Sequence, residues 1–306
     1  MTTRVLVTGG SGFLGKSLVK RLEEEGYYVW APSSNWDLRM RPMAENAVVH
    51  KNWDVIIHAA GSVGGIGANQ RNPGKFMYEN LAMGINMVHA ASSFAPTARF
   101  IMLGTVCAYP KFCEVPFREE DMWNGYPEET NAPYGIAKKA LMKLVETYHE
   151  QYGFDGVNLV PVNMYGPYDH FELHNSHVIP AIIVKFFQAI QNDDPYVTLW
   201  GTGNASREFL YVEDCCTAIL KAINANPGPE PINIGTGKEV TIRELAETVA
   251  QLVGYDGEIR WDTGKPDGQP RRCLDTTRAT ERLGFTAQTS LREGLEETIA
   301  WYRRNR

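Results

Sequence analysis

A short apolar run followed by three evenly spaced glycines stands near the start of the chain. Residues 5–7 (Val-Leu-Val) have the composition of a buried strand, Gly9, Gly12 and Gly15 follow, and residues 16–21 are helical in character. Without side chains, the backbone can approach a pyrophosphate closely, and the N-terminus of the next helix directs free N–H groups at negative charge. This strand–turn–helix order predicts the first unit of a dinucleotide-binding sheet.

Short β-rich runs alternate with helical stretches over the first 165 residues. The strand-like runs lie at 5–7, 28–30, 55–58, 100–103 and 156–162, and helix-period apolar residues fill 16–25, 76–92 and 137–152. Such alternation predicts an α/β protein with a Rossmann-type doubly wound parallel sheet. After Gly166 the pattern loosens, and pieces at 179–190, 197–200, 242–252 and 291–302 predict a smaller, discontinuous C-terminal substrate lobe. We expect residues 1–165, plus roughly 208–236, to bind the cofactor, and residues 166–207 and 237–306 to bind the substrate.

Bulk properties exclude several classes of protein. With 306 residues and 43% hydrophobic content the chain can bury a large core, and its formal net charge of −6 argues against nucleic-acid binding. No apolar stretch approaches the roughly 20 residues of a membrane helix, and the first residues lack the apolar segment of a signal peptide. The five cysteines are scattered without metal-ligand spacing. We therefore expect a cytoplasmic protein with free thiols, no bound metal, no membrane contact and no nucleic-acid partner.

The end of the second predicted strand bears on cofactor choice. No carboxylate follows it directly, so a 2′-phosphate would meet no repulsion there, and Arg39 or the serines at 33 and 34 can contact that phosphate. NADP(H) is therefore favoured. Asp37 can still reach the adenosine ribose or the adenine, which leaves NAD(H) possible, and Arg39 can equally be a solvated loop charge.

Tyr134 and Lys138 lie four residues apart on a predicted helix, and that spacing places both side chains on one face. An ammonium near a phenol favours phenolate, which would lower the pKa of the tyrosine toward the range of a proton donor at neutral pH. Taken alone, such a pair is more often two exposed residues on a helix surface.

The fourth predicted strand ends at Gly104 and Thr105, with Cys107 two residues further on. Strand ends in a parallel sheet face the ligand, where the Thr105 hydroxyl can hydrogen-bond a substrate carbonyl oxygen beside the Tyr134 phenol. Cys107 can present its thiol on the same side, although an isolated cysteine is usually a small buried hydrophobe.

Further motifs follow one another along the chain. They are HAA (58–60), VGGI (63–66), GTVCAYPK (104–111), TNAPYGIAK (130–138), NMYGP (163–167), NSHVIP (175–180), WGTG (200–203), REFL (207–210) and KPDG (265–268). Together with the Gly-x-x-Gly-x-x-Gly turn, they resemble the GDP-L-fucose synthase family of extended short-chain dehydrogenases over nearly the whole chain.

The resemblance implies an NADPH-dependent conversion of GDP-4-keto-6-deoxy-D-mannose to GDP-L-fucose, by epimerisation at C3 and C5 and then reduction of the C4 ketone. It implies that Cys107 is the base and His177 the acid of epimerisation, while Thr105 and Tyr134 hold the enolate oxygen. In the reduction, Tyr134 would donate a proton, and Lys138 would lower the pKa of that phenol and bind the nicotinamide ribose. The same side chains would serve whether one carbon or both are inverted.

The resemblance also implies binding residues, and a homodimer formed by two helices of each subunit. Cofactor contacts are expected from Gly9, Gly10, Ser11, Gly12, Phe13, Leu14, Gly15, Asp37, Leu38, Arg39, Ala59, Ala60, Leu103, Gly104, Lys138, Pro161, Asn163, Met164 and His177. Contacts to the GDP-sugar are expected from Lys185, Trp200, Arg207 and Asp267. Lys185 stands where the family usually has an arginine, and Ser11, Thr105 and His170 also differ from the usual residues.

Other activities remain alternatives: a related NDP-4-keto-6-deoxy-sugar reductase or epimerase with a different sugar, or an NAD-dependent NDP-sugar 4-epimerase. A 4-epimerase would keep Tyr134 and Lys138 but would not need Cys107 and His177. A 4,6-dehydratase needs a carboxylic acid close to Thr105, and the residues that follow supply none. A cofactor-sensing regulatory protein can keep the glycine turn while losing the tyrosine or the lysine, and this chain has both.

Overall fold

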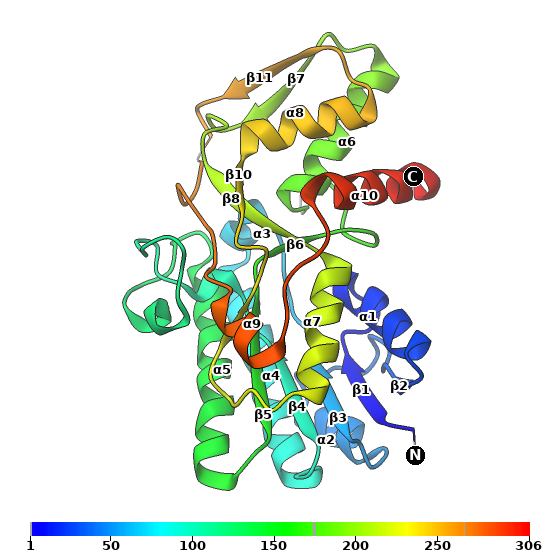
Figure 1. The fold of residues 1–306 in the computed structure, drawn as a ribbon, viewed down its shortest axis with the longest axis vertical. Helices are drawn as coiled ribbons and strands as arrows, with labels where there is room; N and C mark the ends of the chain where they lie inside the picture. Colours follow the sequence, from blue (N-terminus) through cyan, green and yellow to red (C-terminus); the bar gives the residue numbers. More distant parts are fainter. Residues whose placement is uncertain (1, 174–175, 266) are drawn as a thin grey trace.

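The computed structural model describes residues 2–173, 176–265 and 267–306, so Asn175 and Pro266, which belong to two of the motifs above, lie outside the described residues. A large sheet with its helices forms one end of the elongated molecule, and a smaller lobe forms the other (Figure 1). The strands are β1 (Arg4–Thr8), β2 (Tyr28–Trp30), β3 (Val55–His58), β4 (Arg99–Leu103), β5 (Gly156–Pro161), β6 (Asn163–Tyr165), β7 (Tyr196–Trp200), β8 (Ser206–Tyr211), β9 (Ile232–Ile234), β10 (Glu239–Thr241) and β11 (Glu258–Asp262). The helices are α1 (Phe13–Glu24), α2 (Arg41–Val49), α3 (Ile66–Arg71), α4 (Pro73–Phe94), α5 (Ala132–Tyr152), α6 (Val178–Asn192), α7 (Val212–Asn224), α8 (Ile242–Val253), α9 (Thr277–Leu283) and α10 (Leu291–Asn305), with short 3-10 turns η1 (Val106–Ala108) and η2 (Glu119–Trp123).

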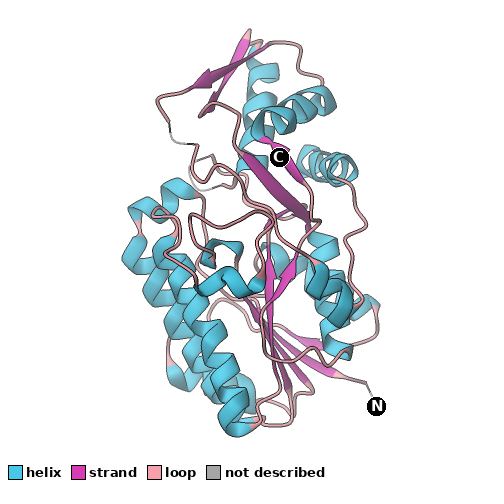
Figure 2. Cartoon of the chain, turned by 60° about the vertical axis from the view of Figure 1, so that its left-hand side comes forward, coloured by secondary structure: helices cyan, strands magenta, loops and turns pink. Residues whose placement is uncertain are grey.

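Six parallel strands form the central sheet, in the order β2-β1-β3-β4-β5-β9. Strands β3 and β5 are buried along their whole length, because helices cover both faces of the sheet. One face carries α2, α4 and α5 and the other carries α1 and α7, and helices are visible on both sides of the strands in Figure 2. The predicted doubly wound α/β fold is therefore confirmed.

The second lobe is built from separate pieces of the chain. The parallel pair β7–β11 and the three-stranded sheet β10-β8-β6 lie with α6, α8 and α10 beyond the central sheet (Figure 1). Apolar side chains of these elements form a core of their own, in which Phe186 and Leu245 are fully buried. After β11 the chain returns to the first core, where Ala279 and Phe285 pack. The domain bounds given above stay a prediction.

Helix α1 begins without a side-chain cap. Its N-cap residue is Gly12, and no side chain of the described residues accepts a hydrogen bond from its first N–H groups. By contrast, α8 and α10 begin with complete capping boxes, Thr241 with Glu244 and Ser290 with Glu293. Unpaired N–H groups are therefore left at the start of α1, directly after β1.

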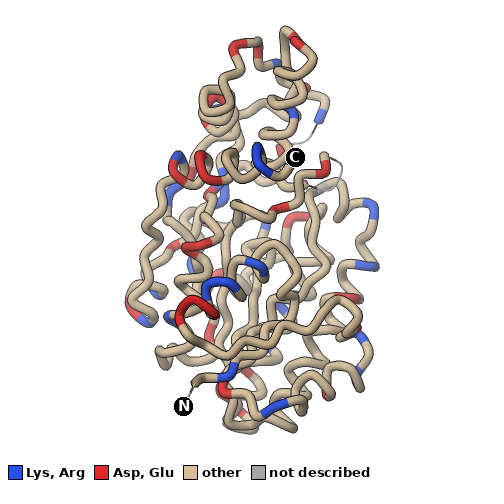
Figure 3. The backbone as a smooth tube through the Cα atoms, turned by 90° about the vertical axis from the view of Figure 1, so that its right-hand side faces the viewer, with Lys and Arg blue, Asp and Glu red and all other residues tan. Residues whose placement is uncertain are grey.

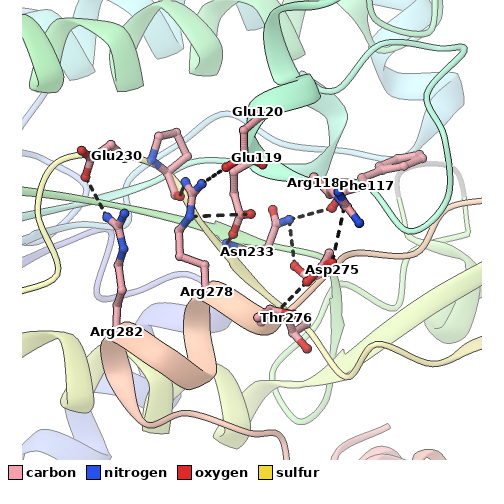
Figure 4. A network of polar contacts seen from close by, with 12 residues as sticks. Phe117, Arg118, Glu119, Glu120, Glu230, Asn233, Asp275, Thr276, Arg278 and Arg282 are labelled. Carbon is pink, nitrogen blue, oxygen red and sulfur yellow. Dashed lines mark hydrogen bonds and ion pairs between the residues drawn. The ribbon is translucent and has the colours of Figure 1, made fainter.

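Asn233 on the edge strand β9 ties three segments together (Figure 4). Its N–H donates to Glu119 Oε1 at 2.9 Å, and its Oδ1 accepts from the Tyr109 hydroxyl at 2.7 Å. Its Nδ2 donates to the carbonyls of Phe117 and Asp275, at 2.9 and 3.0 Å. The turn that ends at Tyr109 and the loop around residue 117 are thereby fixed to the sheet.

Two arginines of α9, Arg278 and Arg282, belong to the same polar network (Figure 4). Arg278 pairs with Glu119 and Glu120, and Arg282 Nη1 lies 2.8 Å from Glu230 Oε2. Burial raises the pKa of Glu119, while the N–H of Asn233 opposes that rise. The network holds a segment of the second half of the chain against the loop that follows β4.

Charged residues of both signs are interspersed over the two lobes (Figure 3). No helix within residues 2–173, 176–265 and 267–306 is long and apolar enough to cross a membrane. The same residues contain no cluster of histidine, cysteine and carboxylate side chains that could hold a metal ion. All five cysteines are free thiols.

Gly9→Ala should destabilise the protein more than Gly26→Ala. Both glycines have positive φ angles, +76° and +83°, which costs an L-residue about 1 kcal/mol. A Cβ at Gly9 would lie 2.7 Å from the Cα and N atoms of Ala60, whereas a Cβ at Gly26 would have no atom within 4 Å. Urea denaturation should show that the free energy of unfolding falls by about 2–4 kcal/mol in Gly9→Ala and by about 1 kcal/mol in Gly26→Ala. Equal losses would mean that the contact with Ala60 relaxes freely.

Candidate active site

The cofactor residues predicted from the sequence lie mostly at the carboxyl ends of the strands. Gly9 to Gly15 follow β1, Asp37, Leu38 and Arg39 follow β2, Ala59 and Ala60 follow β3, Leu103 and Gly104 end β4, Pro161 ends β5, Asn163 and Met164 stand in β6, Lys138 lies in α5 and His177 precedes α6. Parallel strands present their carboxyl ends at one edge of the sheet, which is where open α/β sheets bind ligands. The structure thus gathers most of this set at one edge.

The glycine turn leaves no room for side chains. The Gly12 N–H donates to the Gly9 carbonyl at 2.9 Å, and a Cβ at Gly15 would lie 2.0 Å from that same oxygen. A Cβ at Gly10 would lie 2.4 Å from the Cβ of Ala31. The bare backbone and the uncapped N–H groups of α1 fit a dinucleotide pyrophosphate, because the start of a helix attracts negative charge.

Arg39 is engaged by two carboxylates. Its Nε and Nη2 donate to the two carboxylate oxygens of Asp37, both at 2.8 Å, and its Nη1 lies 2.6 Å from Glu79 Oε1. The Arg39 hydrogen bonds hold the pKa of Asp37 below its usual value. A contact from Arg39 to a 2′-phosphate, which the sequence suggested, would have to compete with both carboxylates.

Tyr134 lies against the turn that carries Thr105 and Cys107. Helix α5 starts so close to this turn that a Cβ on Gly135 would lie 2.2 Å from the Cys107 carbonyl oxygen. Tyr134 is buried and packs with Cys107, and its phenol interacts with the Thr105 side chain. Thr105 Oγ1 also accepts from the Cys107 N–H at 3.2 Å. Three predicted catalytic residues are therefore in contact, and Gly135 permits this close approach.

Lys138 is buried one turn further along α5. Its Nζ donates to the Leu103 carbonyl at 3.0 Å, and burial lowers its pKa to about 8. Burial, and after it the charge of Cys107, raises the pKa of Tyr134 above its usual value, and the contact with Thr105 opposes this only in part. The free protein thus shows the opposite of the lowered Tyr134 pKa expected from the sequence, because desolvation outweighs a lysine that is itself desolvated.

His177 is the N-cap residue of α6, on the second lobe. Its Nδ1 lies 3.7 Å from Asp169 Oδ1, and the imidazole is 40% exposed while the Asp169 side chain is 1% exposed. Within the described residues, no hydrogen bond is made by His177 Nδ1 or by Asp169 Oδ2. His177 thus lies on a different element from Tyr134, Thr105 and Cys107, and the buried carboxylate of Asp169 can orient its ring. Sequence reasoning missed Asp169.

Arg207 and Asp267 meet where the second lobe joins the sheet. Arg207 Nη2 donates to the Asp267 carbonyl at 3.0 Å, and its Nη1 donates to the Ser206 carbonyl at 2.7 Å. Burial, followed by the charge of Arg272, lowers the pKa of Arg207 to about 10. The Asp267 carboxylate accepts from the N–H and the hydroxyl of Thr202, at 2.7 and 2.8 Å. A buried guanidinium held by carbonyls is suited to an anionic ligand.

Lys185 and Trp200 lie further out on the second lobe. Lys185 Nζ donates to the Thr198 carbonyl at 2.8 Å, and burial lowers its pKa. Trp200 is 58% exposed at the end of β7, with the Lys265 ammonium 5.4 Å from its ring centroid. The exposed indole can stack with a flat ring of a ligand.

Arg272 contacts a predicted catalytic residue, although the sequence did not single it out. Its Nη1 donates to Cys107 Sγ at 3.7 Å across 165 residues of chain. Its nearest motif is KPDG at 265–268, and neither spacing nor periodicity connects it to Cys107. Only the fold brings the two side chains together.

Lys138→Met should alter the pH dependence of stability. The Lys138 pKa changes from 10.5, its ordinary value, to about 8 on folding, so the unfolded chain binds more protons between these values. The wild-type free energy of unfolding should therefore rise with pH through this window, by about 3 kcal/mol in total, relative to Lys138→Met. Urea denaturation of both proteins across the window measures the difference.

Lys143→Met is the matched control for this experiment. Lys143 is half exposed on the same helix, and its hydrogen bond with Glu146 raises its pKa. The free energy of unfolding of Lys143→Met should therefore rise with pH through the same window, and by the same amount, as that of the wild type. Parallel stability curves for the wild type and Lys138→Met would contradict the burial effect.

Known proteins resemble the chain over nearly its whole length. Residues 5–235 match the model of the NAD dependent epimerase/dehydratase family. GDP-L-fucose synthase 1 of Arabidopsis thaliana is 39% identical over 99% of this chain and 94% of its own, and GDP-L-fucose synthase of Escherichia coli (strain K12) is 38% identical over 99% and 97%. GDP-L-colitose synthase of Yersinia pseudotuberculosis is 37% identical over 98% and 97%.

Among solved structures, a GDP-L-fucose synthetase from Naegleria fowleri bound to NADP has a TM-score of 0.89 and 25% identity, over 100% of this chain and 96% of its own. The near-complete overlap with that solved structure agrees with the fold described above. The chain therefore belongs to the NAD dependent epimerase/dehydratase family, and within it to the GDP-L-fucose synthase group of extended short-chain dehydrogenases.

Proposed function

We propose that the protein converts GDP-4-keto-6-deoxy-D-mannose to GDP-L-fucose with NADPH, by epimerisation and then reduction. The observation that carries this proposal is the contact of Tyr134 with both Thr105 and Cys107, with Lys138 one turn behind. A proton donor for ketone reduction therefore lies beside a thiol that can remove a proton from carbon. The relatives named GDP-L-fucose synthase support the choice of substrate.

Epimerisation begins at a carbon next to the C4 ketone. The Cys107 thiolate removes the proton: the C–H bond breaks, an S–H bond forms, and the electron pair moves into the ketone to give an enolate. The hydroxyls of Thr105 and Tyr134 donate to the enolate oxygen. His177, oriented by Asp169, donates a proton to the opposite face of the carbon, which restores the ketone with inverted configuration. Exchange with water then removes the thiol proton and reprotonates the imidazole, so the same residues can act on the second carbon.

Reduction follows at C4. NADPH supplies the hydride when it is bound. Tyr134 donates its proton to the C4 oxygen, and the raised pKa of the free protein keeps the phenol protonated until that step. The Lys138 ammonium stabilises the phenolate that remains and donates to the nicotinamide ribose.

The binding residues divide between the two lobes. The glycine turn and the start of α1 hold the cofactor pyrophosphate, and NADP(H) is preferred because no carboxylate follows β2 directly. The Naegleria fowleri structure bound to NADP supports that preference. On the second lobe, Arg207 and Lys185 neutralise the GDP diphosphate, while Trp200 and Asp267 contact the nucleotide-sugar.

A homodimer formed through α4 and α5 accounts for the apolar surface on these helices. Tyr78 and Ile85 share one face of α4 and are 64% and 47% exposed, and Tyr152 on α5 is 60% exposed. A second copy packed on this face would bury them. Sedimentation equilibrium should give twice the chain mass of 34.3 kDa for the wild type and a single chain mass for Ile85→Glu. A monomeric wild type would contradict the dimer.

Purified protein should oxidise NADPH and form GDP-L-fucose when it is given GDP-4-keto-6-deoxy-D-mannose, as followed by NADPH absorbance and by NMR of the product. Cys107→Ser should suppress solvent deuterium incorporation at C3 and C5 about a hundredfold, because the base is lost. In the same variant, the rate of hydride transfer to an already epimerised ketone should fall by less than about tenfold, because Tyr134 and Lys138 remain.

Cys113→Ser is the matched control, because Cys113 is also a half-buried free thiol, on the loop after η1. It should leave both rates unchanged. Unchanged deuterium exchange in Cys107→Ser would mean that Cys107 only packs. Turnover of another GDP-4-keto sugar in place of this substrate would favour the second candidate, an activity like that of the GDP-L-colitose synthase relative.

A further inference from the structure

Arg272 is a buried cation without a carboxylate partner. It is 7% exposed, and both its Nε and its Nη2 donate to Gln269 Oε1 at 3.2 Å. Its remaining terminal nitrogen, Nη1, donates to Cys107 Sγ at 3.7 Å. Within the described part of the chain, no carboxylate forms an ion pair with this guanidinium.

Gln269 clamps the guanidinium in this position. Its Nε2 donates to the Lys111 carbonyl at 2.9 Å and to the Pro110 carbonyl at 3.4 Å. Because the amide nitrogen is fixed by these two acceptors, the amide oxygen has to face Arg272. Gln269 is itself 5% exposed, so water does not replace it easily. The clamp leaves Nη1 directed at the sulfur.

A buried charge without a counterion is unfavourable, and arginine does not lose its proton in proteins. Of the two side chains that accept hydrogen bonds from Arg272, Gln269 and Cys107, only the Cys107 thiol can become negatively charged. Loss of the thiol proton to water turns the Nη1–Sγ contact into a charge-assisted pair, the setting that makes a cysteine reactive. Neutral Cys107 would leave the guanidinium uncompensated.

The other groups that face Cys107 do not oppose this. Thr105 on the preceding turn is neutral, and its Oγ1 accepts from the Cys107 N–H. Tyr134 from α5 stays protonated at neutral pH, since burial raises its pKa. Arg207 from β8 is a second buried cation whose charge interacts with that of Cys107. The two cations that interact with the sulfur, Arg272 and Arg207, are both positive at neutral pH, and Arg207 also interacts with the carboxylates of Asp267 and Glu128.

We propose that Arg272, clamped by Gln269, is a positioning residue that holds Cys107 as a thiolate directed at the substrate carbon. This rests on the proposed function, in which Cys107 removes the proton next to the ketone. During that step the C–H bond breaks and the S–H bond forms, so the negative charge leaves the sulfur for the enolate oxygen. Arg272 then keeps its fixed place and favours renewed loss of the thiol proton to water.

Alkylation of Cys107 by iodoacetamide, followed by peptide mass spectrometry on the free full-length protein across pH, tests the proposal. In Arg272→Gln the pH midpoint of Cys107 alkylation should rise by about one unit relative to the wild type, which lowers the rate at neutral pH about tenfold. Arg272→Lys should recover part of the shift. Cys113 serves as the internal reference, since burial raises its pKa to about 11 and it does not contact Arg272.

Arg271→Gln is the matched control, because Arg271 is exposed, pairs with Glu239 and does not contact Cys107. Its Cys107 midpoint should equal that of the wild type. Equal midpoints in the wild type and Arg272→Gln would overturn the proposal. If Arg272→Gln does not fold, Gln269→Ala, which releases the clamp, should raise the midpoint, and an unchanged midpoint would overturn the proposal equally.

Alkylation needs no substrate, so the two proposals fail separately. A shifted midpoint without turnover of GDP-4-keto-6-deoxy-D-mannose would contradict the proposed function and leave the thiolate assignment standing. Turnover with an unshifted midpoint would contradict only the role of Arg272. With substrate, Arg272→Gln should also shift the pH profile of deuterium exchange in the same direction as the alkylation midpoint.

Discussion

The fully buried carboxylate of Glu208 on β8 joins three segments of the chain that are far apart in sequence. It accepts the N–H of Gly237 at 2.8 Å and of Leu274 at 2.7 Å, as well as that of Thr236. Burial raises the pKa of Glu208, and these backbone donors oppose the rise. Loss of the carboxylate would orphan all three donors, at about 1–3 kcal/mol each. The strand that carries Arg207, the turn after β9 and the segment that carries Arg272 all meet at this one side chain.

A second constraint acts on the sheet side of the site. Helix α5 reaches the Cys107 carbonyl only because residue 135 has no Cβ. That approach puts Tyr134 beside Cys107 and places Lys138 under the end of β4. Tyr134 and Thr105 near the central sheet and Arg272 from a much later segment are thus positioned by different elements, and all three contact Cys107. The proposed mechanism therefore uses different side chains for proton transfer at carbon and for proton transfer to oxygen.

Local sequence patterns were sufficient to predict the strand–glycine–helix unit and the alternation of strands and helices up to residue 165. The strands at 28–30 and 55–58 begin and end at the predicted residues, and α4 and α5 contain the predicted helices. The contact of Arg272 with Cys107 spans 165 residues and leaves no periodic signal. The direction of the Tyr134 pKa was wrong because it depends on burial, which spacing does not reveal. Asp169 and Glu208 were missed because a buried carboxylate resembles an exposed one in sequence.

In the proposed mechanism, Cys107 and His177 move protons at carbon independently of the hydride step. The most direct measurement is wild-type protein incubated in deuterium oxide with GDP-4-keto-6-deoxy-D-mannose and oxidised NADP, with the sugar analysed by NMR. Deuterium should appear at the carbons on both sides of the ketone, with no reduction at C4. Absence of deuterium under these conditions, together with reduction of the unexchanged sugar once NADPH is added, would contradict this mechanism.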